Sequence, residues 1–195
     1  MTRQQIIQKR KSLDFNFQHK CSLEVTYKIL SLPQFHQAIN VGVYYAANGE
    51  IATSTIINKI LETKKNCYLP IVNQKENTLF FVKYNEGDTL SKNQFGILEP
   101  SKSAENKANV IDLIKLDFLV TPLVAFDVKG NRLGMGLGFY DKTFAYKKNN
   151  KNQKPFMCGL AYEFQKLPEI IPNEWDIPLD CVITEKKIYL GSRRL

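Results

Sequence analysis

The sequence is poor in histidine and cysteine, and neither residue forms a catalytic or metal-binding pattern. The two histidines and four cysteines are His19, His36, Cys21, Cys67, Cys158 and Cys181. No C-x-x-C pair or zinc-finger spacing is present, and no Ser-His or Cys-His arrangement indicates a protein nucleophile. The cysteines stand in apolar or helical contexts. We therefore expect buried free thiols and a reducing, cytoplasmic location.

Long apolar runs are also missing. No run approaches the length of a membrane span, and the N-terminus does not resemble a signal peptide. There is no arginine-rich tract or RNP aromatic motif, so we expect neither a membrane nor a nucleic acid as partner. The chain does carry 27 Lys and Arg against 19 Asp and Glu, a net charge of +8. That balance favours anionic partners such as nucleotides, although a solvated basic surface explains it equally well.

The order of apolar patterns predicts an α/β fold. A length of 195 residues suits a single domain, 1–195. Helical patterns begin after Thr2, Asp14 and Thr53, each a candidate N-cap. Strand patterns occupy residues 39–45, 67–72, 78–84, 118–122, 156–161, 181–184 and 188–190. Residues 85–110 are polar and turn-rich, and we interpret them as a surface excursion or lid.

The stretch from Arg132 to Lys142, Arg-Leu-Gly-Met-Gly-Leu-Gly-Phe-Tyr-Asp-Lys, is the strongest local signal. Glycines at spacing two leave backbone N–H groups uncovered, as anion-binding loops do. A helical pattern follows and would add the positive end of its dipole. Arg132 and Lys142 add fixed charge, and Asp141 is a carboxylate that could hold a divalent metal. Together these residues indicate a polyphosphate site.

The glycine spacing leaves a second interpretation open. The Walker loop and the dinucleotide fingerprint G-x-G-x-x-G are both absent, because the spacing here is G-x-G-x-G. A tight turn between a strand and a helix, with Asp141 as a first-turn helix charge, accounts for the same residues equally well. Glu50 is similarly open: it follows the strand pattern at 39–45, where α/β sheets bind ligands, or it is only a helix-entry charge.

Several motifs taken together resemble a known family. Residues 121–127 read Thr-Pro-Leu-Val-Ala-Phe-Asp, and Gly-Asn-Arg-Leu-Gly at 130–134 leads into the glycine-rich stretch. Glu-Ile-Ala-Thr at 50–53 and Ile-Leu-Glu-Pro at 97–100 precede them, and Gly-Leu-Ala-Tyr at 159–162 follows. In this order, over nearly the whole chain, they resemble the 5-formyltetrahydrofolate cyclo-ligase family, also called 5,10-methenyltetrahydrofolate synthetase.

The resemblance implies a fold and a reaction. It implies a three-layer domain, with a central mixed, largely parallel sheet flanked by helices and the glycine-rich loop at strand carboxyl ends. The implied activity is ligation of carbon to nitrogen: ATP- and Mg²⁺-dependent cyclisation of 5-formyltetrahydrofolate to 5,10-methenyltetrahydrofolate, with ADP and phosphate released. The formyl oxygen would attack the γ-phosphate to form a phosphorylated imidate. We further expect a monomer.

The resemblance also assigns site residues. The implied ATP-binding residues are Arg3, Arg10, Arg132, Leu133, Gly134, Met135, Gly136, Leu137, Gly138, Phe139 and Tyr140. The implied folate-binding residues are Tyr45, Glu50, Met135, Gly136, Leu137, Gly138 and Phe139. Asp141 and Asp176 are the implied Mg²⁺ ligands.

The sequence departs from the family pattern at a few of these positions. Leu137 stands where Lys or Gly is common, Phe139 lacks the hydroxyl of a tyrosine, and Trp175 stands where His or Asn is more usual. Two alternatives therefore stay open. One is a non-catalytic nucleotide- or folate-binding relative, and the less favoured one is a basic nucleic-acid-binding protein.

Overall fold

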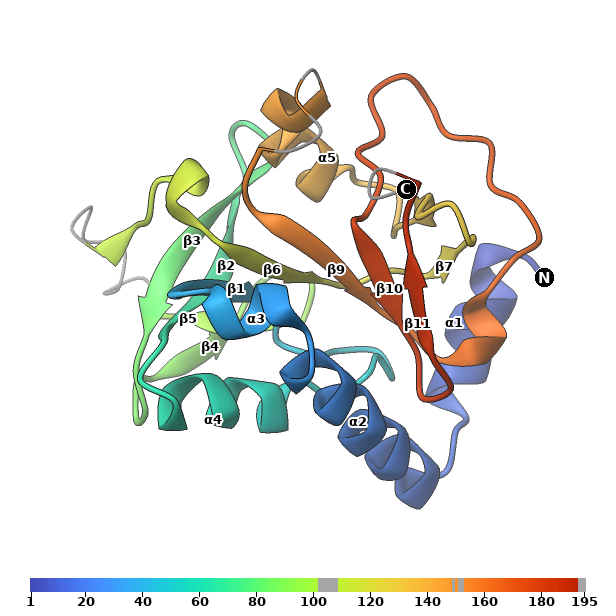
Figure 1. Cartoon of the computed structure of the whole chain (residues 1–195), viewed down its shortest axis with the longest axis horizontal. Helices are drawn as coiled ribbons and strands as arrows, with labels where there is room; N and C mark the ends of the chain where they lie inside the picture. The colour runs from blue at the N-terminus through green and yellow to red at the C-terminus, as the bar shows by residue number, and fades with distance from the viewer. Residues whose placement is uncertain (102–108, 149, 151–152, 193–195) are drawn as a thin grey trace.

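A mixed sheet forms the centre of the computed structural model, which describes residues 1–101, 109–148, 150 and 153–192 (Figure 1). Its seven strands, in spatial order, are β11 (Ile188–Leu190), β10 (Cys181–Ile183), β9 (Phe156–Leu160), β6 (Phe118–Thr121), β1 (Asn40–Val43), β2 (Asn66–Asn73) and β3 (Thr78–Tyr84). The strands from β10 to β2 are parallel, whereas the edge strands β11 and β3 pair antiparallel. The predicted mixed, largely parallel sheet is confirmed.

Helices cover both faces of this sheet. The helices α2 (Phe15–Leu30), α3 (Pro33–Gln37) and α4 (Ser54–Glu62) lie on one face, and α5 (Phe139–Thr143) with the 3₁₀ turn η4 (Ala145–Lys148) lies on the other (Figure 1). None of the helices in the described ranges is both long and apolar enough to cross a bilayer.

Alternation along the central strands divides the core between the two faces. In β6, Phe118 and Val120 join the apolar cluster under α2 and α4, whereas Leu119 joins the cluster on the α5 face. All three side chains are fully buried. This period of two is what a strand covered on both faces requires.

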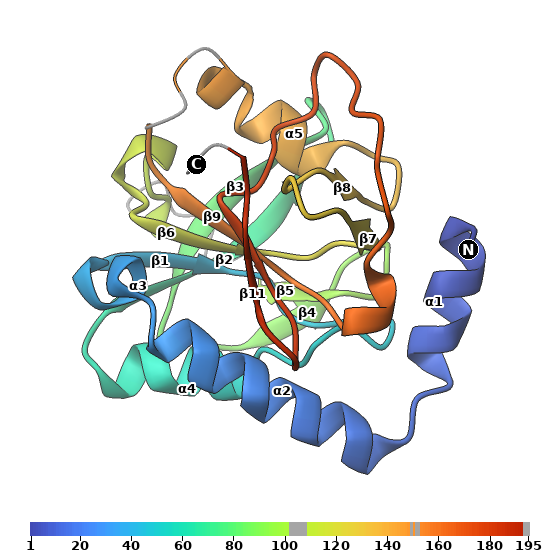
Figure 2. The same ribbon diagram turned by 45° about the vertical axis from the view of Figure 1, so that its right-hand side comes forward.

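The first helix, α1 (Arg3–Lys11), packs apart from the others. Thr2 caps it as predicted, and Asp14 caps α2. The buried side chain of Ile6 lies in a small apolar cluster with Val124 and Ile170, which brings α1 beside β7 (Ala125–Phe126) (Figure 2). β7 pairs with β8 (Arg132–Leu133), the strand that leads directly into the glycine-rich loop.

Two local predictions need correction. The helix after the glycine-rich loop has only five residues, so its dipole adds little to an anion site. The segment at 85–110 is not simply a surface excursion, because it contains the hairpin of β4 (Leu90–Lys92) and β5 (Leu98–Pro100). The part of the predicted lid at 102–108 lies outside the described residues. A 3₁₀ turn, η3 (Leu113–Lys115), then leads into β6.

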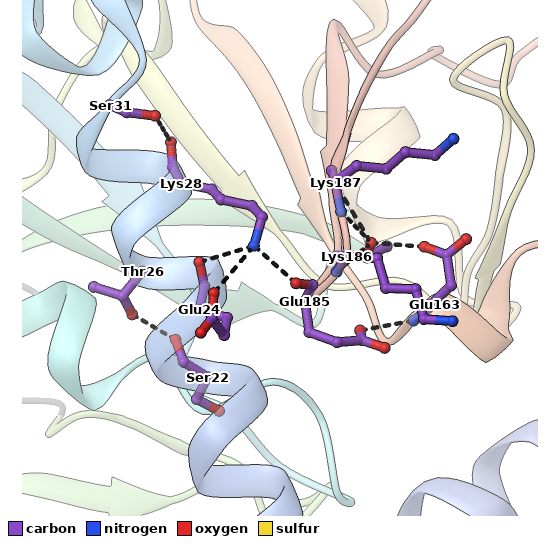
Figure 3. Close-up of polar contacts among 10 residues, drawn as sticks. Ser22, Glu24, Thr26, Lys28, Ser31, Glu163, Glu185, Lys186 and Lys187 are labelled. Atoms are coloured by element: carbon purple, nitrogen blue, oxygen red, sulfur yellow. Dashed lines mark hydrogen bonds and ion pairs between the residues drawn. The ribbon is translucent and has the colours of Figure 1, made fainter.

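A polar network fixes the 3₁₀ turn η5 (Glu163–Gln165) after β9 (Figure 3). Lys28 of α2 donates to the Glu185 carbonyl at 2.8 Å, and the Glu185 carboxylate accepts from the Glu163 N–H at 2.9 Å. The Glu163 carboxylate in turn accepts from the Thr184 hydroxyl at 2.7 Å. The network therefore ties η5 to the β10–β11 turn, which in turn is tied to α2.

We predict that Gly130→Ala destabilises the fold much more than Gly87→Ala. Both glycines have a positive φ, 89° and 87°. A Cβ at Gly130 would lie 2.5 Å from the Leu179 carbonyl oxygen, whereas a Cβ at Gly87 meets nothing within 4 Å. Backbone strain, about 1–2 kcal/mol, is common to both variants, and the clash should add about 1–3 kcal/mol at Gly130. Denaturant unfolding measures the difference, and equal losses would contradict this packing.

Candidate active site

A cavity of about 310 Å³ opens at the carboxyl ends of the parallel strands. Tyr44 and Tyr45 reach it from the end of β1, and Pro122, Leu123 and Val124 from the end of β6. The glycine-rich loop forms another wall, and the β4–β5 hairpin contributes Asn93, Phe95, Ile97, Leu98 and Glu99. The predicted loop position at strand carboxyl ends agrees with this geometry.

Glu50 provides a carboxylate in the wall of this first cavity. Its Oε2 accepts from the Ala47 N–H at 3.0 Å, and its Oε1 lies 3.9 Å from Arg10 Nη1. Only 15% of the side chain is exposed. Burial raises the pKa of Glu50, while the Ala47 hydrogen bond and the Arg10 charge oppose that rise. The carboxylate keeps acceptor capacity for a ligand N–H group.

Aromatic rings surround this carboxylate. Burial raises the pKa of Tyr44 and of Tyr140, so both phenols stay neutral at physiological pH. The Tyr44 hydroxyl donates to the Ile51 carbonyl at 2.9 Å. Phe95 of the hairpin packs edge-on against Phe139, with ring centroids 5.9 Å apart. A flat apolar ligand with N–H donors on one edge suits such a cavity.

The glycine-rich loop is bare for a conformational and a spatial reason. Gly136 and Gly138 have positive φ values of 100° and 69°. A Cβ at Gly134 would meet nothing within 4 Å, and one at Gly136 would meet only Arg3 Nη1, at 3.6 Å. Packing therefore does not require these glycines, and the open space beside them leaves the backbone accessible to a ligand.

An ion pair joins the two ends of this loop. Arg132 Nη2 lies 2.6 Å from Asp141 Oδ1, and the two side chains are 6% and 19% exposed. Ile177 completes a ring: its carbonyl accepts from Arg132 Nη1 at 2.6 Å, and its N–H donates to Asp141 Oδ1 at 3.0 Å. Within the described ranges, the hydrogen bonds and ion pair of Asp141 all use Oδ1.

A second cavity, of about 470 Å³, lies on the other side of the loop. Its lining consists of Gly136, Leu137, Gly138, Asp141, Lys142, Ala145, Lys148, Trp175 and Ile177. It shares Leu137, Gly138 and Asp141 with the first cavity. One cavity is thus aromatic and carries Glu50, and the other is basic, with the shared loop between them.

The structure brings most of the predicted site residues to these two cavities. Tyr45, Glu50, Arg132, Gly134, Met135, Leu137, Gly138, Phe139, Tyr140 and Asp141 line the first, and Gly136 lines the second with Arg3 nearby. Leu133 packs against the apolar cluster under α1. Arg10 is 1% exposed, and its contacts are with Leu123 and Glu50, away from the loop. Individual ligand contacts stay predictions.

The two aspartates suit magnesium only if a ligand completes the site. Asp141 already faces Arg132, and Asp176 Oδ2 accepts from the N–H and the side-chain amide of Asn173 at 2.8 and 3.2 Å. Asp176 adjoins Ile177, whose N–H donates to Asp141, but the lining of the basic cavity includes Asp141 and not Asp176. Among the described residues, no three His, Cys, Asp or Glu side chains form a metal cluster. Phosphate oxygens would have to supply the remaining ligands.

Sequence reasoning missed part of the cavity wall. Phe95 and Leu123 carry no chemical signal and enter the site only through the fold. Glu99 belongs to a motif in the family resemblance, and it accepts from the Asn93 side chain at 2.9 Å, which closes the hairpin. Trp175 was noted only as a departure, yet it lines the basic cavity and is 66% exposed.

Comparison with known proteins decides the family. The sequence model of the 5-formyltetrahydrofolate cyclo-ligase family matches residues 1–185. The chain belongs to this family. A 5-formyltetrahydrofolate cyclo-ligase of Haemophilus influenzae is 41% identical over 163 residues, covering 83% of this chain and 84% of that protein. The Escherichia coli cyclo-ligase is 34% identical over 185 residues, covering 94% and 98%.

Solved structures agree with the family assignment. The structure of Aquifex aeolicus 5,10-methenyltetrahydrofolate synthetase matches with a TM-score of 0.80 at 30% identity, covering 96% of this chain and 90% of that one. The corresponding Mycoplasma pneumoniae structure matches with a TM-score of 0.72 at 20% identity and shows the fold alone. Members of this cyclo-ligase family are enzymes that form a carbon–nitrogen bond.

We predict that a nucleotide in the basic cavity changes the protein's intrinsic fluorescence. Trp175 is the single tryptophan and lies in that cavity wall, so a bound base or phosphate would alter its surroundings. Titration with ATP and Mg²⁺ should give a saturable change with the Kd found by calorimetry. Trp175→Phe should abolish the signal but leave calorimetric binding measurable. If calorimetry detects ATP binding but the fluorescence does not change, the nucleotide binds outside this cavity.

Proposed function

We propose that this chain catalyses the ATP- and Mg²⁺-dependent conversion of 5-formyltetrahydrofolate to 5,10-methenyltetrahydrofolate, releasing ADP and phosphate. The observation that carries the proposal is the pair of cavities that share Leu137, Gly138 and Asp141. An aromatic cavity with a carboxylate suits the folate, and a basic cavity suits the nucleotide. Their common wall is where the two substrates would meet.

The first cavity has the chemistry to bind the pterin part of the folate. Its aromatic rings, Tyr45, Phe95 and Phe139, offer faces and edges to a flat heterocycle. Glu50, in its ionised form, accepts hydrogen bonds from the amino and ring N–H groups. Binding by a carboxylate and rings fixes orientation as well as affinity, so it would direct the formyl group toward the loop.

The second cavity has the chemistry to bind polyphosphate. Lys142 and Lys148 line it, and Arg3 approaches it from α1 next to Gly136. The bare backbone of the glycines lets phosphate oxygens approach the N–H groups. These positive charges would neutralise the triphosphate and its transition state, the main contribution of proteins to phosphoryl transfer.

The reaction requires no protein nucleophile. The formyl oxygen attacks the γ-phosphorus, the bond from that phosphorus to ADP breaks, and a phosphorylated imidate results. The neighbouring folate nitrogen then attacks the imidate carbon, the carbon–oxygen bond breaks, and phosphate leaves with the former formyl oxygen and takes up the proton that the nitrogen loses. The protein holds both reactants in line and excludes water. Magnesium, which Asp141 and Asp176 would hold, supplies further charge neutralisation when it is bound.

Two further expectations accompany this function. The four buried free cysteines suit a reducing compartment, and we infer a cytoplasmic protein. We also keep the expectation of a monomer that binds neither nucleic acid nor membrane. The non-catalytic alternative, suggested by Leu137 and Phe139, differs in one measurable property, since such a relative would not consume ATP in response to 5-formyltetrahydrofolate.

The absorbance change on forming 5,10-methenyltetrahydrofolate tests the proposal directly. Purified protein with 5-formyltetrahydrofolate, ATP and Mg²⁺ should show this change together with stoichiometric ADP. Omitting either ATP or Mg²⁺ should abolish it. ATP binding without product, at protein concentrations that allow many turnovers, would support the non-catalytic alternative.

For Glu50→Gln we predict weaker folate binding with nucleotide binding almost unchanged. The substitution keeps the size of the side chain and removes its charge, so about 1.5–3 kcal/mol of charge-assisted hydrogen bonding is lost. Calorimetry with each ligand separately measures both affinities. Equal weakening for folate and MgATP would remove the specific role of Glu50.

The variant Asp141→Asn should fold and lose turnover. The amide oxygen can still accept from Arg132 and from the Ile177 N–H, so we expect a stability loss of about 1–2 kcal/mol at most. Loss of the charge beside the phosphates should lower kcat by about a hundredfold or more, and excess Mg²⁺ should restore little. Asp112→Asn, which changes an exposed helix-cap carboxylate, is the matched control. A fully active Asp141→Asn enzyme would refute the proposed metal role.

A further inference from the structure

Arg10 is a buried cation that lies behind the first cavity. Its side chain is 1% exposed, and its Nη1 donates to the Leu123 carbonyl at 3.0 Å. The same nitrogen lies 3.9 Å from Glu50 Oε1. Leu123 and Glu50 belong to different walls of the cavity, after β6 and after β1. One nitrogen of Arg10 therefore connects two segments that the folate would touch.

The remaining donors of Arg10 have no partner within the described residues. Its Nε and Nη2 are buried without a hydrogen bond, and so is the Tyr162 hydroxyl. A buried charge with unpaired donors is costly, and replacing such a group with apolar side chains often stabilises a protein. Fold stability therefore does not explain why an arginine occupies this buried position, whereas a function at the adjacent cavity does.

Backbone packing joins the same helix to the loop that carries Glu50. Gly49 has a φ of 72°, and a Cβ there would lie 2.7 Å from the Arg10 carbonyl oxygen. The end of α1 and the 47–50 loop are therefore in direct contact. Gln165 donates to the same Leu123 carbonyl as Arg10, at 3.2 Å, and to the Val124 carbonyl at 2.8 Å. Two buried side chains therefore hold the backbone after β6 that lines the cavity.

We propose that Arg10 is a positioning residue for the folate site, which keeps the Glu50 carboxylate ionised and aimed into the cavity while fixing Leu123 from behind. The inference rests on the proposed role of Glu50 in folate binding. It assigns Arg10 a function different from the nucleotide contact implied by the family resemblance. Arg3, seven residues earlier on the same helix, stays the residue near the glycine-rich loop.

The groups that face Glu50 determine how this function depends on pH. They are Arg10 from α1, Tyr44 from the end of β1, Tyr140 from α5, Tyr162 after β9 and the Ala47 N–H. The three phenols are neutral, so Arg10 supplies the positive charge. The ionised form of Glu50 is the form proposed to bind the folate, and burial raises the pKa of Glu50. Folate affinity should therefore fall as the pH falls through that pKa. Removing Arg10 raises the pKa of Glu50 further, so the fall begins at a higher pH.

The test is the pH profile of folate binding, measured by calorimetry on the full chain. We compare wild type, Arg10→Gln and Lys11→Gln, the last of which removes a charge from the exposed side of the same helix turn. Arg10→Gln should displace the profile toward higher pH, with about tenfold weaker binding on its acidic side and a smaller loss at basic pH. Lys11→Gln should follow wild type. A loss for Arg10→Gln that is the same at every pH would overturn the proposal.

A second variant keeps the proposal testable if Arg10→Gln does not fold. Arg10→Lys retains the charge but is too short to serve Leu123 and Glu50 together. It should weaken folate binding by about threefold or more with Glu50 present, and by less than about twofold in a Glu50→Gln background. Equal losses in both backgrounds would refute positioning through Glu50. If Glu50→Gln alone binds folate like wild type, the proposed folate role of Glu50 fails instead.

Discussion

The partly buried ion pair between Arg132 and Asp141 is the interaction on which the site depends. It joins the strand before the glycine-rich loop to the helix after it, and Ile177 bonds to both partners. With its ends fixed in this way, the loop can keep its glycines free of side-chain packing. The pair also neutralises Asp141, so the loop does not carry an isolated negative charge at the place proposed for phosphate. An arginine suits this place because its planar fork serves a carboxylate and a carbonyl at once.

The helix α1 relates the two cavities to each other. Arg3 at its start lies by Gly136, and Arg10 near its end lies by Glu50 and Leu123. These positions are seven residues apart, about 10 Å along a helix, which is a short distance between the two proposed substrate sites. Because a helix is stiff over two turns, a nucleotide that orders Arg3 would also restrict the segment that holds Glu50. A single element thus contributes to both halves of the site.

The sequence alone indicated the residue types that line the candidate site, but not the distant segments that enclose it. The glycine spacing, Asp141 and the position of Glu50 after a strand were all visible, because each depends on residue type and local order. The burial of Arg10 was not visible, since a helix surface pattern gives no sign that Glu50 and Leu123 will meet it. The β4–β5 hairpin and Trp175 were missed for the same reason: their places depend on contacts between segments distant in sequence. The shortness of α5, which gives way to the 3₁₀ turn η4, was likewise not evident from its helical pattern.

The central claim is that the formyl group and the γ-phosphate react directly at the wall shared by the two cavities. Labelling the formyl oxygen of 5-formyltetrahydrofolate with ¹⁸O and analysing the released phosphate by mass spectrometry tests it. Because the formyl oxygen attacks phosphorus and leaves with it, each phosphate should carry one labelled oxygen. Phosphate without the label, formed together with methenyl product, would mean that ATP is cleaved by water and would contradict the account.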